Sequence, residues 1–195
     1  MNYYVADTHF GAMSVLPYRP FASTKEMDEV ILDRINNSVG RNDTLFIVGD
    51  AFGYNGNPAL IRRIRADVVL VPGNHDVPLL RKRRYQGVFS RILPTTVTVY
   101  DATVNRKFFL CHYPCCSWDG AREGVIHLYG HLHARTDDGF EVAKWLPNAV
   151  NVGVDVNDFR PLTGKEVLRR TAEQNRSLAN APFALPTWPR CHIVA

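Results

Sequence analysis

The stretch DVVLVPGNHDVP, residues 67–78, begins as an apolar run and ends on a cluster of polar residues. The run VVLV is rich in β-branched residues, which indicates a buried strand. A proline and a glycine then turn the chain, and Asn74, His75 and Asp76 follow directly. These three side chains bind protons or metal ions. Because a turn needs only the proline and the glycine, the cluster predicts a functional site where the strand ends.

The same arrangement, a short apolar run followed by polar residues, recurs along the chain. The runs predict strands at residues 2–6, 44–48, 67–71, 96–100, 107–111, 125–129 and 149–154. Several are apolar throughout, as expected for strands that are buried on both faces of a sheet. Asp7, Asp50 and Asn74 each follow one of these runs, and so do five of the seven histidines, namely His9, His75, His112, His131 and His133. Ligands bind at the carboxyl ends of strands in open α/β sheets, so these residues predict one site on one rim.

Three segments carry helical signals. Periodicity is clearest at residues 24–39, where Ser23 and Glu26 predict a capping box at the start. A second helix is expected to open at Asn57-Pro58, and a third to cover residues 163–174. Strands alternate with helices early and dominate later, which predicts an α/β fold with helices outside buried sheets.

The composition is that of a globular domain. The chain has 195 residues, with 46% hydrophobic and 22% charged residues, which excludes a disordered or fibrous protein. We expect residues 1–174 to form one domain and residues 175–195, which contain three prolines, to form a C-terminal tail. The formal charge of +4 permits an anionic substrate but does not require a nucleic acid.

The sequence also predicts where the protein works. No apolar run approaches the roughly 18 residues that span a membrane, and the start, MNYYVADTHFG, lacks the features of a secretory signal. The four cysteines contain no CxxC pair, which indicates reduced thiols. We therefore expect a cytoplasmic protein without membrane contact, and no feature indicates an obligate protein partner.

The residue types at the predicted rim suit divalent transition metals, which bind carboxylate and amide oxygens and imidazole nitrogens. The candidate ligands are Asp7, His9, Asp50, Asn74, His112, His131 and His133. A closed tetrahedral zinc site needs four ligands, so seven fit two metals that share a bridge. Asp50 is the best-placed bridge because a carboxylate has two oxygens. Glycines at 49, 73 and 130 relieve crowding where the backbone turns under the site.

Five motifs, in this order, carry a resemblance to a known family: DTH (7–9), GD (49–50), GNHD (73–76), His112 and GHLH (130–133). They resemble the motifs of the calcineurin-like metallophosphoesterase superfamily over roughly residues 3–155. The segments DTHFG and NVGVD resemble a bacterial and phage subgroup of small members. The chain departs from the pattern at Ala12, where many of that subgroup have histidine, and at Gly53, where some family members have a carboxylate.

The resemblance implies a fold and a ligand set. The implied fold is two packed mixed β-sheets flanked by helices, a four-layer α/β/β/α sandwich. The implied ligands of one metal are Asp7, His9, Asp50 and His133. Those of the other metal are Asp50, Asn74, His112 and His131. Of the metals that such nitrogen and oxygen ligands accept, we expect manganese, with iron, zinc, nickel and cobalt as alternatives.

The resemblance also implies an activity, the hydrolysis of phosphomonoesters or phosphodiesters. Attack would come from a hydroxide that bridges the metals, and His75, which is not a ligand, would face the substrate as the candidate general acid. Asp76 would either support His75 or tie down its loop. The substrate would be a phosphorylated small molecule, a nucleotide, a nucleic acid or, less favoured, a phosphoprotein. A non-catalytic metal-binding scaffold is the alternative from a different class.

Several other residues have two interpretations. The run RKRR, residues 81–84, is either a solvated helix face or a patch that attracts phosphates, with Asn74, His75 and Arg81 as candidate substrate contacts. His127 and His192 are expected to be structural. Asp155 and Asn151 are expected to orient ligands or to support the fold. The segment CCSW, residues 115–118, is expected to form a loop over the site.

Overall fold

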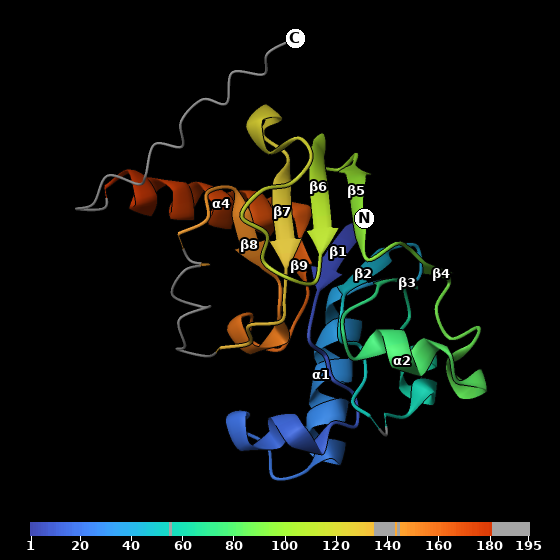
Figure 1. Ribbon diagram of the computed structural model, residues 1–195. Helices are drawn as coiled ribbons and strands as arrows, with labels where there is room; N and C mark the ends of the chain where they lie inside the picture. The colour runs from blue at the N-terminus through green and yellow to red at the C-terminus, as the bar shows by residue number, and fades with distance from the viewer. Residues whose placement is uncertain (55, 135–142, 144, 181–195) are drawn as a thin grey trace.

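Two mixed β-sheets pack face to face at the centre of the protein, and helices flank them (Figure 1). This computed structural model describes residues 1–54, 56–134, 143 and 145–180. The strands are β1 (Asn2–Val5), β2 (Thr44–Val48), β3 (Asp67–Val71), β4 (Arg91–Ile92), β5 (Thr96–Asp101), β6 (Arg106–Cys111), β7 (Ile126–Tyr129), β8 (Ala149–Asn151) and β9 (Leu162–Thr163). The predicted class, α/β with two packed mixed sheets, is confirmed.

Each sheet is parallel apart from one edge strand. The first sheet has the order β4-β3-β2-β1-β9, in which only β9 runs antiparallel to its neighbour. The second has the order β5-β6-β7-β8, in which β5 is antiparallel to β6. In the first sheet Val5 pairs with Ile47 and Val48 pairs with Val71, so the residues that follow β1, β2 and β3 reach the same edge.

The ends of the two sheets meet. In the second sheet Leu110 pairs with Leu128, which brings the residues after β6 and β7 to one level. A single parallel bridge between Ala6 and Gly153 then joins the end of β1 to the segment that follows β8. The carboxyl ends of five strands, β1, β2, β3, β6 and β7, therefore open onto one rim.

Side chains alternate between the two faces of the first sheet, as strand geometry requires. One face packs on α1 (Thr24–Ser38), and its buried residues include Val5, Leu45, Ile47, Val68 and Leu70. The other face packs on the second sheet, and its buried residues include Tyr4, Phe46, Val48, Val69 and Val71. Burial on both faces explains why β1, β2 and β3 are apolar after their first residues.

The helices differ in detail from the prediction. At the start of α1, Ser23 Oγ accepts from the Glu26 amide, but the Glu26 carboxylate accepts from Ala22 rather than from Ser23, so the capping box is only half formed. α4 (Gly164–Ala179) has the full capping box, between Thr163 and Glu166. α4 also extends beyond residue 174, the predicted end of the third helix. Residues 181–195 of the expected tail, including His192, lie outside the described residues.

Three other expectations need correction. The predicted helix at Asn57-Pro58 is a 3-10 helix, η2 (Pro58–Arg63), and not an α-helix. β8 ends at Asn151, because the Asn151 side chain accepts from the Gly153 amide and turns the chain into η5 (Val154–Val156). β4 and β9, which have two residues each, were not predicted.

The remaining described helices are short. They are η1 (Met13–Tyr18), α2 (Asp76–Leu80), η3 (Arg83–Tyr85) and η4 (Ala121–Glu123). Within the described ranges, no helix has both the length and the hydrophobicity needed to cross a bilayer.

Candidate metal centre

The structure brings six of the seven predicted ligands together at the rim. Asp7 and His9 follow β1, and their amides donate to the carbonyls of Gly49 and Asp50 at 3.0 and 2.9 Å. Gly130, which precedes His131 and His133, donates to the His112 carbonyl at 2.9 Å. Backbone hydrogen bonds between neighbouring strand ends therefore fix the backbone positions that carry these side chains.

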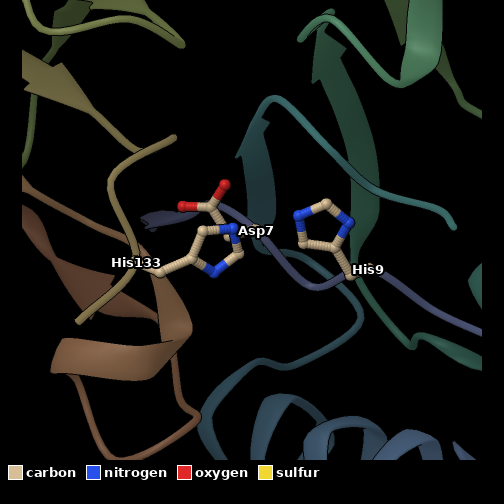
Figure 2. A group of neighbouring side chains, drawn as sticks. All are labelled: Asp7, His9 and His133. Atoms are coloured by element: carbon tan, nitrogen blue, oxygen red, sulfur yellow. The ribbon is translucent and has the colours of Figure 1, made fainter. Parts of the chain in front are cut away.

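The six side chains form two groups. Asp7, His9 and His133 make the first group, and Figure 2 shows them converging from two separate segments of the chain. The second group is Asp50, His112 and His131, and within each group the ligand atoms lie within 4.8 Å of one another. Asp50 Oδ2 is 3.6 Å from His9 Nε2 and 3.2 Å from His112 Nε2, so this carboxylate lies between the groups.

Hydrogen bonds set the direction of two imidazoles. Nδ1 of His112 lies 3.0 Å from the Val48 carbonyl, which can only accept, so Nδ1 carries the proton and Nε2 is free to bind a cation. Nδ1 of His133 lies 2.7 Å from Asp155 Oδ2 in the same way. Metal-binding histidines usually donate their other ring nitrogen to such an acceptor.

Buried ring nitrogens without partners indicate what the groups hold. Both ring nitrogens of His9 and Nε2 of His112 are buried and have no hydrogen-bond partner among the described residues. Buried polar atoms are normally paired, because an unpaired one loses its contact with water without compensation. Divalent cations bind imidazole nitrogen and carboxylate oxygen, so the donor set fits two metal ions.

The pKa values of the clustered side chains also indicate a site for cations. Burial raises the pKa of Asp7 to about 6 and lowers the pKa of His9 to about 3. For Asp50, burial favours the neutral acid, but the charge of the His112 imidazole, whose Nε2 lies 3.2 Å from Oδ2, outweighs it and holds the pKa at about 2. The same contact, with the charge of Asp7, raises the pKa of His112 to about 9 although burial opposes it. Two buried carboxylates thus attract positive charge to this point.

The backbone at the site is strained. Asp7, His9, Asp50, His131 and His133 have positive φ angles of 59°, 48°, 54°, 70° and 53°. Non-glycine residues rarely adopt this left-handed region, which costs of the order of 1 kcal/mol or more each. Such strain persists only where the surrounding structure enforces it, and it concentrates at functional sites.

Two glycines allow the close packing around Asp50 and His112. A Cβ on Gly49 would lie 2.2 Å from His112 Nδ1, and a Cβ on Gly73 would lie 2.3 Å from Asp50 Oδ1. Gly49 also has a φ of 85°, which a side chain would strain. The predicted role of these glycines in relieving crowding is confirmed.

His75 lies beside the two groups and faces open space. Its ring is 49% exposed, and its Nε2 is 3.9 Å from Asp50 Oδ2. A cavity of about 330 Å³ adjoins it, lined by His9, Ser14, Val15, Tyr18, Arg19, His75, His133, Ala134 and Asp155. The cavity is wide enough for a small ligand beside the candidate metal ligands.

Asp76 ties down the loop and does not contact the His75 ring. Its buried carboxylate accepts from the amides of Asp50 at 2.7 Å, Ala51 at 2.9 Å and Gly73 at 2.9 Å. These bonds join the loop after β2 to the loop after β3. Burial, the largest influence, raises the Asp76 pKa to about 6.

Two other predictions about polar residues are confirmed. His127 is a buried structural residue: its Nδ1 lies 3.2 Å from the Phe109 carbonyl, and its Nε2 accepts from the Cys115 amide at 3.1 Å. Asp155 orients His133, as described above. Burial opposes the ionised form of Asp155, but hydrogen bonds from His133 and Arg19 hold its pKa at about 2.

Residues 113–120 form a loop that starts at the site. The Tyr113 ring packs edge-on against His131, with 4.5 Å between ring centroids. Cys115 is half-buried, and Cys116 is exposed.

The two remaining candidates lie exposed. Asn74 follows Gly73, and its side chain forms no hydrogen bond within the described part of the chain. Arg81 is the C-cap residue that follows α2, and Arg83 and Arg84 belong to η3.

Sequence reasoning missed Ser14, Tyr18 and Arg19. They come from η1 and its end, a segment without periodicity or a recognisable motif. Arg19 contacts residues far away in sequence, at positions 7, 8, 27 and 155, so no local pattern marks it.

The two packed mixed sheets and the two groups of candidate ligands at their rim indicate a metal-dependent hydrolase. The chain belongs to the calcineurin-like phosphoesterase family, whose profile matches residues 3–176. This family hydrolyses phosphoesters with the help of divalent metals, so the chain is placed among metal-dependent phosphoesterases.

Individual relatives add little about substrates. The uncharacterised protein MJ1445 of Methanocaldococcus jannaschii is 27% identical over 170 residues, which cover 83% of this chain and 85% of that protein. The crystal structure of AQ665 from Aquifex aeolicus, a protein of unknown function, superposes with a TM-score of 0.68 at 22% identity, covering 87% and 98% of the two chains, and has the same fold. An archaeal phosphodiesterase reaches a TM-score of only 0.43 at 19% identity, over 78% and 81% of the chains, too weak a likeness for any argument.

Proposed function

We propose that this protein is a dinuclear metal-dependent phosphoesterase. One cation would be held by Asp7, His9, Asp50 and His133, and the other by Asp50, Asn74, His112 and His131. The observation that carries the proposal is the position of Asp50 Oδ2 between two groups of ligands that contain buried, unpartnered imidazole nitrogens. Manganese is the proposed metal, and iron, zinc, nickel or cobalt suit the same donors.

When bound, the two cations would supply a water activated as a nucleophile and would neutralise charge on the phosphoryl oxygens. The protein holds them in place through Val48 and Asp155, which orient His112 and His133. Asp7 is oriented in turn by the His131 amide, which donates to both carboxylate oxygens at 3.1 and 3.0 Å.

His75 is the proposed proton donor to the leaving group. It borders the cavity with about half of its ring exposed, and its backbone amide donates to Asp50 Oδ1 at 2.9 Å, which fixes the start of the side chain. Asp76 is engaged by three amides, and Gly53 offers no carboxylate, so neither assists the ring. We infer that the imidazole N–H acts directly on the leaving oxygen.

The test compares two substrates. A poor leaving group needs a proton, whereas p-nitrophenolate leaves without one. We expect His75→Ala to lower kcat about 100-fold or more on phenyl phosphate and far less on p-nitrophenyl phosphate, with both metals retained by elemental analysis. Equal losses on both substrates would refute the proton-donor role.

Asp50→Ala should abolish metal-dependent activity, and full activity in that variant would refute the shared bridge.

The substrate is proposed to be a phosphorylated small molecule or a nucleotide, which a 330 Å³ cavity suits. A nucleic acid is the second candidate. The four exposed cations of residues Arg81–Arg84 favour it, because lysine and arginine side chains attract backbone phosphates. In this case Asn74 and Arg81 would contact phosphate.

A panel separates these candidates: Mn²⁺-loaded protein on p-nitrophenyl phosphate, its bis ester, cyclic nucleotides and single-stranded DNA. Turnover of DNA above all others would favour the nuclease. Two bound metals without turnover of any substrate would favour a non-catalytic scaffold.

We further propose a cytoplasmic location, which the three free cysteines of the described residues support, and activity without an obligate protein partner or a membrane.

A further inference from the structure

Arg19 is a buried arginine at the wall of the cavity. It follows η1, and its side chain is 0% exposed. An arginine beside a phosphoesterase site suggests a phosphate ligand, because a guanidinium matches phosphate oxygens. The contacts of Arg19 decide against that role.

All five N–H groups of Arg19 already have partners. Nε donates to Asp155 Oδ1 at 2.7 Å, and Nη2 donates to Asp155 Oδ2 at 2.8 Å and to the Asp7 carbonyl at 2.6 Å. Nη1 donates to the Thr8 carbonyl at 3.2 Å and approaches the Met27 sulfur at 3.4 Å. A guanidinium has five N–H donors, so none remains for a substrate phosphate.

The residues that Arg19 contacts belong to, or orient, only one of the two groups of candidate ligands. Asp155, held at both oxygens by Arg19, accepts from His133 Nδ1 at 2.7 Å and so directs Nε2 of that ring. The carbonyls of Asp7 and Thr8 belong to the strained segment that carries Asp7 and His9. None of the contacts found for Arg19 in the described structure reaches Asp50, His112 or His131.

We propose that Arg19 is a positioning residue that sets the metal affinity of the Asp7–His9–His133 group and leaves the Asp50–His112–His131 group unchanged. This inference rests on the proposed function, because it requires that both groups bind metal. Removing residues that orient metal ligands typically weakens metal binding about 10–100-fold. The dependence on Arg19 is therefore measurable site by site.

The experiment titrates metal-free protein with Mn²⁺ by isothermal calorimetry. The variant is Arg19→Met, which keeps the length of the side chain and removes its donors. Arg34→Met is the matched control: Arg34 lies 5.8 Å from the Phe159 ring, as Arg19 lies 5.9 Å from it, but Arg34 is exposed and donates to the Asp158 carbonyl. Unfolding of each metal-free variant is followed in parallel.

We expect two Mn²⁺ sites in the wild type and in Arg34→Met. In Arg19→Met one site should keep its affinity within about threefold, and the other should weaken about 10–100-fold. Arg19→Lys, which keeps the charge but cannot span both oxygens of Asp155 and the carbonyls, should weaken the same site less and provides the test if Arg19→Met does not fold.

Four results would overturn the inference. Unchanged affinities at both sites in a folded variant would show that Arg19 only supports the fold. Equal weakening of both sites would show that the substitution loosens the whole candidate metal centre and not one group of ligands. A raised KM with unchanged metal affinities would assign Arg19 to substrate binding. A wild-type protein that binds no Mn²⁺ would overturn the proposed function as well, so the two failures are distinguishable.

Discussion

His127 gives a prediction for stability against pH that does not involve a metal ligand. It is fully buried in β7, with Nδ1 toward the Phe109 carbonyl and Nε2 accepting from the Cys115 amide. Burial lowers its pKa from 6.5 to about 4, although nearby carbonyls oppose the shift. A proton on Nε2 would displace the Cys115 amide from its acceptor and point to the Tyr113 carbonyl, 3.1 Å away, which offsets only part of the cost of burying the charge. The folded protein therefore holds this ring neutral in a range where the unfolded chain protonates it.

The sign and size of the effect follow from this difference. Between pH 6.5 and about 4 the unfolded state binds more protons, so the free energy of unfolding falls as the pH falls through this window. Each unit of pKa difference corresponds to about 1.4 kcal/mol. Between pH 7.5 and pH 5 the contribution of His127 is a loss of about 2 kcal/mol.

The assay compares the wild type with His127→Gln, which does not titrate and keeps a donor and an acceptor. Urea unfolding is measured in EDTA by circular dichroism, so that metal release does not contribute. Other groups titrate alike in both proteins and cancel in the difference. We expect His127→Gln to be the less stable protein at pH 7.5, and its deficit to shrink by about 2 kcal/mol at pH 5. A deficit that stays constant or grows on acidification would refute the reasoning.

Two further predictions concern the metal centre. Gly49→Ala should lower the free energy of unfolding, measured by urea denaturation, by at least about 2 kcal/mol. The substitution strains a φ of 85° and places a methyl group against the His112 ring. A change below about 0.5 kcal/mol would contradict the packing described. Mn²⁺ should raise stability by about 2.7 kcal/mol per site at one hundred times its Kd, and EDTA should reverse this gain in thermal unfolding; an unchanged melting temperature would mean that the native state does not bind the ion selectively.

The sequence predicts the strands well because burial on both faces leaves a direct trace. After their first residues, which are polar, β1, β2 and β3 are apolar to the end, since one set of residues packs on α1 and the alternate set packs on the second sheet. β4 and β9 leave no such trace, because two residues cannot show a period. The 3-10 form of η2 is equally hidden: buried Ile61 and Ile64 are three apart, a spacing that suits both helix types.

The candidate ligands are predictable for a different reason. Parallel strands place their carboxyl ends at one edge, so a polar residue after each strand is enough to predict a cluster. What orients these ligands is only partly predictable: Asp155, near the last predicted strand, is a candidate from the sequence, whereas Arg19 is not. Asp155 and Arg19 act across the fold, and their partners are set by how the end of β1 meets the segment after β8.

The strained backbone gives an argument for function that is independent of the motifs. Nine non-glycine residues have positive φ in the described structure, and five of them are candidate metal ligands. Asn105, Asn148 and Asp158 are of types that tolerate this region. Aspartate and histidine are also enriched in this region among non-glycine residues, but glycine would cost less at each of the five positions, so a chain selected only for stability gains nothing from the side chains found there. Phe159, the ninth, is of a type that rarely adopts this region, and its ring lies 5.9 Å from the Arg19 guanidinium, so its strain adjoins the contacts through which Arg19 is proposed to act on the candidate ligands.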